Sequence, residues 1–355
     1  MVRPERQRSR RGPPRDGRER GLSPEPVNGA RYRPGQREGH YESFFQRANH
    51  PSRPLAFWIR YTIFSPEGRP EQAEGELWGV WFDGETGRHV AVKQEHPIRL
   101  CRFDPAALGV EIGGSRLGPG VLEGSAASGG HAISWRLRFS GREPPLLLLA
   151  RRLYASRLPK AKSLVGLPLA CYDGRLEVDG EPVEVAGWVG SQNHNWGRRH
   201  TDRYAWGQVA GFDGHPSSFL EVATARIKLG PLLTPPMTSL VLRHGGEEIA
   251  LNRLRHMLRA SGRLRFFRWD FRSEDERFRV SGTIEAPREA FVGLAYRNPP
   301  GGVKYCLNSK IASCELRFVD WRRGSRATSQ ILATRSRAAF EILTDEGGHG
   351  VEIRA

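Results

Sequence analysis

The sequence has no apolar run long enough to cross a bilayer. Its longest apolar stretches are residues 146–150 and 164–171, and Gly166 and Pro168 interrupt the second one. A membrane-spanning helix needs about 20 consecutive, predominantly apolar residues. The Arg-rich N-terminus is also not followed by the apolar segment of a secretory signal peptide. We therefore expect a cytoplasmic protein without a transmembrane segment.

Cysteine is scarce, with four residues in a chain of 355: Cys101, Cys171, Cys306 and Cys314. None of them forms a CxxC pair or has a Cys or His partner at zinc-finger spacing. His194 lies between two asparagines, and no second His follows at the i+2 position that would share its strand face. The sequence therefore predicts free thiols and no metal site.

Several catalytic motifs are absent from the sequence. It contains no GxSxG, no GxGxxG and no Walker-type glycine loop. These motifs mark serine hydrolases, dinucleotide-binding domains and NTP-binding domains respectively. The sequence therefore gives no support for serine hydrolysis, dinucleotide binding or NTP chemistry.

Positive charge is concentrated at the N-terminus. Residues 1–40 hold 11 Arg and 5 acidic residues, whereas the whole chain has a net charge of +16. An Arg-rich segment with many Pro and Gly residues is typical of a disordered tail. We expect such a tail over residues 1–40. The alternative is a weak contact with an anionic surface, and no specific nucleic acid is expected.

Short segments rich in aromatic and β-branched residues dominate from Tyr41 onward, which is the pattern of strands. The predicted strands are residues 41–47, 56–64, 77–82, 90–94, 133–139, 175–178 and 183–186. Dipeptides that favour hairpin turns lie at positions 83–84, 173–174, 179–180, 213–214 and 245–246. The fold class is mainly β and antiparallel. At roughly 150 residues per domain, we expect two β domains, at residues 41–188 and 189–355.

Aromatic and amide side chains gather between residues 186 and 219. If residues 204–212 form a strand, its two-residue period places Tyr204, Trp206, Gln208 and Phe212 on one face. If residues 219–227 form a strand, the same two-residue period places Glu221 among apolar neighbours on one face. Burial there would raise its pKa and make it a candidate proton donor. This aromatic face either lines a ligand cavity or fills a core, and the pattern alone allows both.

Four segments carry a more specific pattern. They read GRLEVDGEPVEVAGWVGSQNHNWG at residues 174–197, YAWGQ at 204–208, YESFFQRANHPSRPLAFWIRYTIFSP at 41–66 and LAYRNPPGGVKYCLNSKIA at 294–312. Together they resemble the family of tocopherol cyclase, hydroxyneurosporene synthase and AttH-like proteins, in a bacterial branch. The resemblance implies two tandem lipocalin-like antiparallel β-barrel domains with a cavity for a lipophilic molecule, isoprenoid-like or polyketide-like.

The resemblance also implies a site. Family enzymes protonate, hydrate or cyclise at a carbon–carbon double bond without a cofactor, and Trp196, Tyr204 and Trp206 match their aromatic positions. Asn193 stands where the hydratase branch has an Asp, and an amide cannot act as an acid. The candidate proton donors are then Glu221, His194, Tyr204 and Asp202, of which we retain the first three as catalytic candidates. The candidate ligand-binding residues are Asn193, Asn195, Trp196, Trp206, Gln208 and Phe212.

Three functions are compatible with this sequence. The first is binding of a lipophilic small molecule, with cyclase, hydratase or isomerase activity as an option. The second is a carrier without catalysis. The third is binding of nucleic acid or a membrane surface through the basic tail. An acid that faces the aromatic cavity would favour the enzyme over the carrier.

Overall fold

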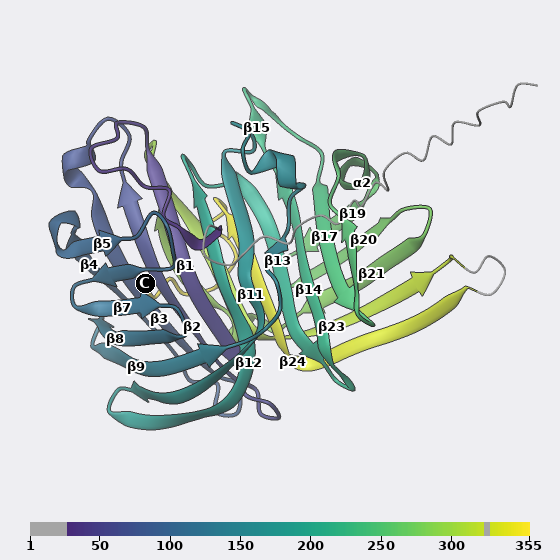
Figure 1. Cartoon of the computed structure of the whole chain (residues 1–355), viewed down its shortest axis with the longest axis horizontal. Coiled ribbons are helices and arrows are strands. Elements are labelled where there is room, and N and C mark those ends of the chain that lie inside the picture. The colour runs from purple at the N-terminus through teal and green to yellow at the C-terminus, as the bar shows by residue number, and fades with distance from the viewer. Residues whose placement is uncertain (1–26, 323–326) are drawn as a thin grey trace, which may run out of the picture.

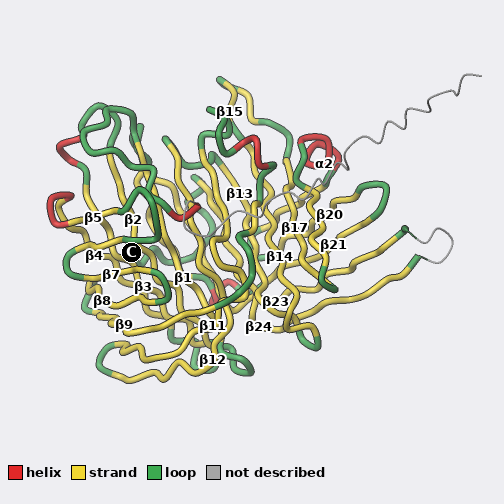
Figure 2. The backbone as a smooth tube through the Cα atoms, in the orientation of Figure 1, coloured by secondary structure: helices red, strands yellow, loops and turns green. Residues whose placement is uncertain are grey.

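The computed structural model describes residues 27–322 and 327–355, which form two large antiparallel sheets side by side (Figure 1). Among the described residues, helices are few and short (Figure 2). They are α2 (Leu254–Arg259) and the 3-10 helices η1 (Pro70–Gln72), η2 (Ile98–Leu100), η3 (Arg151–Leu153) and η4 (Arg288–Ala290). The mainly β prediction is confirmed.

The first sheet has twelve strands in the order β4-β3-β2-β1-β12-β11-β9-β8-β7-β6-β5, and β10 pairs with β11. The strands are β1 (His40–Asn49), β2 (Leu55–Ser65), β3 (Glu74–Asp83), β4 (His89–Pro97), β5 (Cys101–Phe103), β6 (Val110–Ile112), β7 (Ser115–Gly118), β8 (Val121–Ser128), β9 (His131–Ser140), β10 (Leu146–Leu147), β11 (Ala161–Val178) and β12 (Glu181–Gly197). The sheet curls until β4 meets β8, where the backbone N–H of Lys93 donates to Ser128 Oγ at 2.9 Å. It is therefore nearly closed into a barrel.

The second sheet has ten strands in the order β18-β17-β14-β13-β24-β23-β21-β20-β19, and β22 pairs with β23. The strands are β13 (Arg203–Phe212), β14 (His215–Arg226), β17 (Met237–His244), β18 (Glu247–Leu251), β19 (Ser261–Arg265), β20 (Arg268–Glu274), β21 (Phe278–Glu285), β22 (Val292–Arg297), β23 (Val303–Asp320) and β24 (Thr328–Thr344). A separate pair, β15 (Lys228–Leu229) and β16 (Leu232–Leu233), extends from the end of β14.

Strand β2 is buried on both faces, which explains its almost unbroken apolar sequence. Because side chains alternate along a strand, Phe57 and Ile59 belong to the core of the first sheet. Trp58, between them, packs into the core that the second sheet builds. The first sheet thus supplies a wall to both cores, and the space between the sheets is enclosed by residues of each.

The chain passes from the first sheet to the second between Gly197 and Arg203. Strand β12 pairs with β1 and β11 as far as Gly197. The division expected at residues 188 and 189 therefore falls inside β12. A strand hydrogen-bonded on both sides belongs to its sheet over its whole length.

The disordered tail expected over residues 1–40 is too long at its C-terminal end. Val27, Asn28 and Ala30 are buried against the first sheet, and Ala30 N–H donates to the carbonyl of Asp104 at 2.8 Å. Gly29 allows this close approach, since a Cβ there would lie 2.2 Å from the Pro105 carbonyl oxygen. Residues 1–26, which hold eight of the eleven arginines of residues 1–40, lie outside the described residues.

Three of the predicted turns are confirmed, with positive φ at Gly180, Gly214 and Gly245. The turn predicted at Asp173-Gly174 is wrong. Both residues lie within β11, and the pairing with β12 shifts register between Tyr172 and Gly174. A glycine in a strand pattern here marks an irregularity of pairing rather than a chain reversal.

The four cysteines are free thiols, as predicted, and two of them, Cys306 and Cys314, are fully buried in the second core. Across residues 27–322 and 327–355, no helix combines the length and the apolar character that a bilayer crossing demands.

Candidate functional site

A cavity of about 170 Å³ lies between the two sheets, and we call it the interbarrel cavity. Its apolar wall comes from strands of both sheets and from the segment before η3, and includes Phe45, Leu148, Trp206, Ala223 and Met237. The cavity also has polar groups, which come from Tyr41, Lys162, Asn195, Thr201, Tyr204, Ser239 and Glu341. Apolar walls with a few polar groups are typical of small-molecule sites.

Strand alternation brings the aromatic side chains to the cavity. Trp206 on β13 pairs directly with Ala223 on β14, so the two side chains share one face. Tyr204 and Ala225 form the next pair on that face. The small alanines opposite the two large rings leave space that larger residues would fill.

Glu341 on β24 is the carboxylate at the cavity wall. The fully buried ammonium group of Lys310 lies 2.7 Å from Glu341 Oε1, and the Tyr204 hydroxyl donates to Glu341 Oε2 at 3.4 Å. Lys310 Nζ also lies 5.4 Å from the ring centroid of Trp206. The wall therefore carries a compensated ion pair beside an aromatic face.

Asn195 on β12 offers the cavity an unused hydrogen-bond acceptor. Its side-chain oxygen, Oδ1, is buried and accepts no hydrogen bond from the described residues. A buried acceptor without a partner costs about 1–3 kcal/mol. A ligand that donates a hydrogen bond at this position would recover that cost.

Glu221 lies behind Trp206 rather than at the cavity wall. The Trp206 indole N–H donates to Glu221 Oε1 at 2.8 Å, and Gln208 Nε2 donates to Oε2 at 2.7 Å. Burial raises the pKa of Glu221 to about 7, although these two hydrogen bonds and the charge of Arg47 oppose the rise. The expected rise in the pKa of Glu221 is confirmed.

Gln208 and Asn193 belong to a buried polar network between the sheets and do not line the interbarrel cavity. Gln208 Oε1 accepts from Arg47 Nε at 2.7 Å and from Ser191 Oγ at 2.6 Å. Gln208 Nε2 donates to Asn193 Oδ1 at 2.8 Å. All four of these side chains are buried, so the network joins the two sheets rather than facing a ligand.

His194 and Trp196 lie on the opposite face of β12 from Asn195. His194 Nε2 lies 2.7 Å from Glu42 Oε1, and its Nδ1 lies 2.9 Å from the carbonyl oxygen of Val27. The ring of Trp196 is 4.7 Å from that of His194. The two-residue period of the strand therefore separates these two candidates from the interbarrel cavity.

Phe212 is also away from the cavity. The pairing of β13 with β14 shifts register between Ala210 and Phe212, and Gly211 between them has a φ of 81°. The predicted alternation therefore stops before Phe212, which is fully buried in the core of the second sheet. A bulge of this kind cannot be seen in the period of the sequence.

Asp202 has a structural role in the connection between the sheets. Its Oδ2 accepts from the backbone N–H of Lys228 at 2.8 Å and pairs with Arg199 at 2.7 Å. Neighbouring His200 stacks on Tyr41, with ring centroids 4.0 Å apart. Of the predicted residues, Tyr204, Trp206 and Asn195 thus meet at the cavity, and the others lie behind it or elsewhere.

Sequence reasoning missed Glu341 and Lys310. Each is a single charge inside an otherwise uncharged stretch of strand, within CLNSKIASC and AAFEILT. That isolation was the available signal, because charged residues are almost never fully buried unless paired. Their partnership depends on how β23 pairs with β24, where Asn308 lies opposite Glu341, and the sequence does not show that register.

Three carboxylates in the described residues, those of Glu74, Glu76 and Glu95, lie close enough to share a cation. Arg297 forms an ion pair with each of them, and Lys93 lies 3.0 Å from Glu76 and 2.6 Å from Glu95. Two protein cations therefore already compensate this group.

The fold is that of the lipocalin-like barrel proteins of the AttH type. The structure is similar to an AttH-like protein of Nitrosomonas europaea, with a TM-score of 0.58 and 12% identity, over 92% of this chain and 97% of that one. It is also similar to kievitone hydratase from Nectria haematococca, with a TM-score of 0.52 and 10% identity, over 91% of each chain.

In sequence, the chain is similar to the uncharacterized protein Rv0493c of Mycobacterium tuberculosis. The two are 24% identical over 286 residues, which cover 78% of this chain and 81% of the relative. No family model matches the chain.

Proposed function

We propose that this protein binds a lipophilic small molecule, isoprenoid-like or polyketide-like, in the interbarrel cavity. The observation that carries the proposal is the composition of the cavity wall. Both sheets contribute aromatic and aliphatic side chains to it, and Asn195 adds one unpartnered acceptor. Burial of apolar ligand surface would drive binding, and a hydroxyl group on the ligand would satisfy Asn195.

Filling the cavity tests this proposal. Ala223→Phe places a ring opposite Trp206, in the space that a ligand would take. We expect the variant to lose binding of a fluorescent apolar probe that the wild type binds. Ala127→Phe is the matched control, because Ala127 is exposed on β8 of the first sheet. Equal probe binding by wild type and Ala223→Phe would refute the interbarrel cavity as the site.

A second candidate function is cofactor-independent addition of a proton to a carbon–carbon double bond. The observation that favours it is the pKa of about 7 at Glu221, which keeps a large fraction of this carboxyl protonated near neutral pH. Because Glu221 lies behind Trp206, its proton can reach a ligand only if the Trp206 ring turns aside and releases Oε1. The proton would then pass to one alkene carbon, and the cation on the other carbon would take water or lose a neighbouring proton, in either case returning one proton to the Glu221 carboxylate. The faces of Phe45 and Trp206 would stabilise that cation. Kievitone hydratase, named as a hydratase, has a similar fold.

Glu221→Gln tests this second function, since it keeps the volume of the side chain and removes the acid. Turnover of a double-bond substrate should stop, while binding of the apolar probe stays within about twofold of the wild type. Equal turnover by the variant would eliminate Glu221, and Tyr204 would then be the cavity residue to test. The carrier function predicts probe binding without turnover in both proteins.

A further inference from the structure

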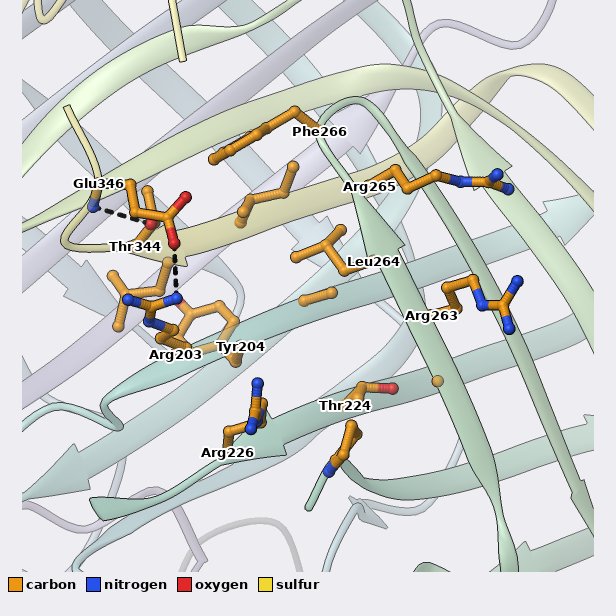
Figure 3. A pocket seen from close by; sticks show the side chains of 15 residues that line it. Arg203, Tyr204, Thr224, Arg226, Arg263, Leu264, Arg265, Phe266, Thr344 and Glu346 are labelled. Carbon is orange, nitrogen blue, oxygen red and sulfur yellow. Dashed lines mark hydrogen bonds and ion pairs between the residues drawn. The ribbon is translucent and has the colours of Figure 1, made fainter. Parts of the chain in front are cut away.

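A second recess lies on the other face of β13, within the second sheet (Figure 3). We call it the second-sheet groove. It has a volume of about 390 Å³ and is bordered by β13, β14, β19 and β24. Its size is within the range of about 300–1,000 Å³ that is common for ligand sites. Tyr204 borders both this groove and the interbarrel cavity.

The groove has an apolar side. Leu264 and Phe266 are each 38% exposed. Both point inward in Figure 3, toward the strand that carries Thr344. Ile342 and Leu343 line the groove near them and are themselves buried. An alkyl chain lying here would remove the exposed surface of Leu264 and Phe266 from water.

Two arginines stand at the other side of the groove. Arg203 on β13 and Arg226 on β14 are direct register partners, so two positive charges face each other across the ladder. Like charges in directly opposite positions destabilise a sheet. The arrangement is therefore unfavourable unless anions compensate both side chains.

Only one of these two charges is compensated by carboxylates of the described residues. Arg203 pairs with Asp345 at 3.0 Å and with Glu346 at 2.6 Å. Arg226 donates from Nε to the carbonyl of Thr234 at 3.0 Å and has no carboxylate within 4.0 Å among the described residues. The Nε of Arg203 is also buried without a hydrogen-bond partner there. Arg263, which also lines the groove, forms no ion pair with a carboxylate of the described residues. The groove thus retains two arginines without a carboxylate partner, Arg226 and Arg263, and one unused donor at Arg203.

We propose that the second-sheet groove binds an amphipathic monocarboxylate of the fatty-acid type. The carboxylate lies between Arg226 and Arg203, and the alkyl chain lies against Leu264 and Phe266. A carboxylate accepts the paired donors of a guanidinium group. A carboxylate brings one negative charge to Arg226, whereas the second charge of a phosphate dianion would lie close to Asp345 and Glu346, which already pair with Arg203, and would add repulsion. This site is separate from the interbarrel cavity, and its ligand is not the one proposed for that cavity.

Binding of dodecanoate, followed by isothermal titration calorimetry on the full chain, tests the proposal. We expect saturable binding to the wild type, and binding of dodecanol or dodecyl phosphate weaker by about 10-fold or more. Arg226→Gln should weaken dodecanoate binding by about 10- to 100-fold. The matched control is Arg175→Gln, because Arg175 is an exposed arginine on β11 of the first sheet and does not line the groove, so the variant should leave the affinity within about twofold.

A second variant covers the case in which Arg226→Gln does not fold. Leu264→Glu changes an exposed residue and places a negative charge in the groove, so it should abolish dodecanoate binding without lowering the melting temperature. Dodecanoate binding that survives Leu264→Glu, equal binding of dodecanol, or an equal loss in Arg175→Gln would each overturn the proposal.

The two proposed sites fail independently. Ala223→Phe should remove binding of the apolar probe in the interbarrel cavity and leave dodecanoate binding intact, and Leu264→Glu should do the reverse. Loss of dodecanoate binding in Ala223→Phe but not in Leu264→Glu would place the carboxylate in the interbarrel cavity and refute the groove.

Discussion

Replacing Gln208 by Leu distinguishes a residue that joins the two sheets from one that contacts a ligand. The amide accepts from Arg47 Nε and Ser191 Oγ and donates to Asn193 and Glu221, at distances of 2.6 to 2.8 Å. Leucine can make none of these hydrogen bonds. The donors of Arg47 and Ser191 and the acceptor of Asn193 would then remain buried without this partner.

We expect Gln208→Leu to lower the free energy of unfolding by about 3 kcal/mol or more. Each buried polar group that loses its partner costs about 1–3 kcal/mol, and Arg47 keeps its hydrogen bond to Asn49 Oδ1 at 2.7 Å. Urea unfolding followed by tryptophan fluorescence measures the change. Gln72→Leu, at the exposed end of η1, is the control and should change stability by less than about 0.5 kcal/mol.

Binding of the apolar probe completes this test. If Gln208 acts only between the sheets, folded Gln208→Leu should bind the probe with an affinity close to that of the wild type. A variant as stable as the wild type but unable to bind the probe would refute the structural role and place Gln208 at the ligand.

Two further predictions concern buried carboxyl groups, and both are checked by urea unfolding across pH. Burial alone would raise the pKa of Glu42, but hydrogen bonds from His194 and His40 outweigh it and lower the pKa to about 2. The ionised Glu42 carboxylate should therefore stabilise the fold fully above about pH 4.5, and this stabilisation should be lost as the pH falls toward 2. Glu42→Gln should lower the free energy of unfolding by about 3–5 kcal/mol at pH 7 and by much less at pH 2.5. A loss of stability that is the same at both pH values would contradict this. Burial raises the pKa of Glu221 to about 7. The unfolded chain ionises this group at lower pH than the folded protein does, so the wild type should lose stability as the pH rises from 4.5 to 7, and Glu221→Gln should gain stability relative to it over that interval. A constant difference in the free energy of unfolding between the two proteins would show that Glu221 titrates normally.

The sequence predicted those parts of the fold that follow from local alternation. The period of two on residues 204–208 correctly placed Tyr204 and Trp206 at one surface, and the apolar neighbours of Glu221 correctly indicated a raised pKa. The same alternation, applied to Asn193, His194 and Asn195, already separates the histidine from the two amides. The sequence reasoning grouped all three by proximity in the chain, and the structure divides them between two faces of β12.

Other features depend on contacts that no local pattern encodes. The bulge at Gly211 turns Phe212 out of the alternation. Residues 27–31 resemble the polar tail in composition, yet the Glu42 carboxylate accepts hydrogen bonds from the backbone N–H groups of Arg31 and Tyr32. The role of the Glu42 carboxylate in holding this segment against the sheet can be recognised only when its hydrogen-bond partners are known.

Native mass spectrometry of the protein purified from its own host tests the central claim most directly. Binding in the interbarrel cavity predicts that the wild type and Ala127→Phe carry a co-purifying lipophilic molecule and that Ala223→Phe, with its cavity filled, does not. If wild type and Ala223→Phe carried the same molecule in the same proportion, or if the wild type bound nothing even after incubation with a lipid extract of the host, the interbarrel cavity would not be a ligand site.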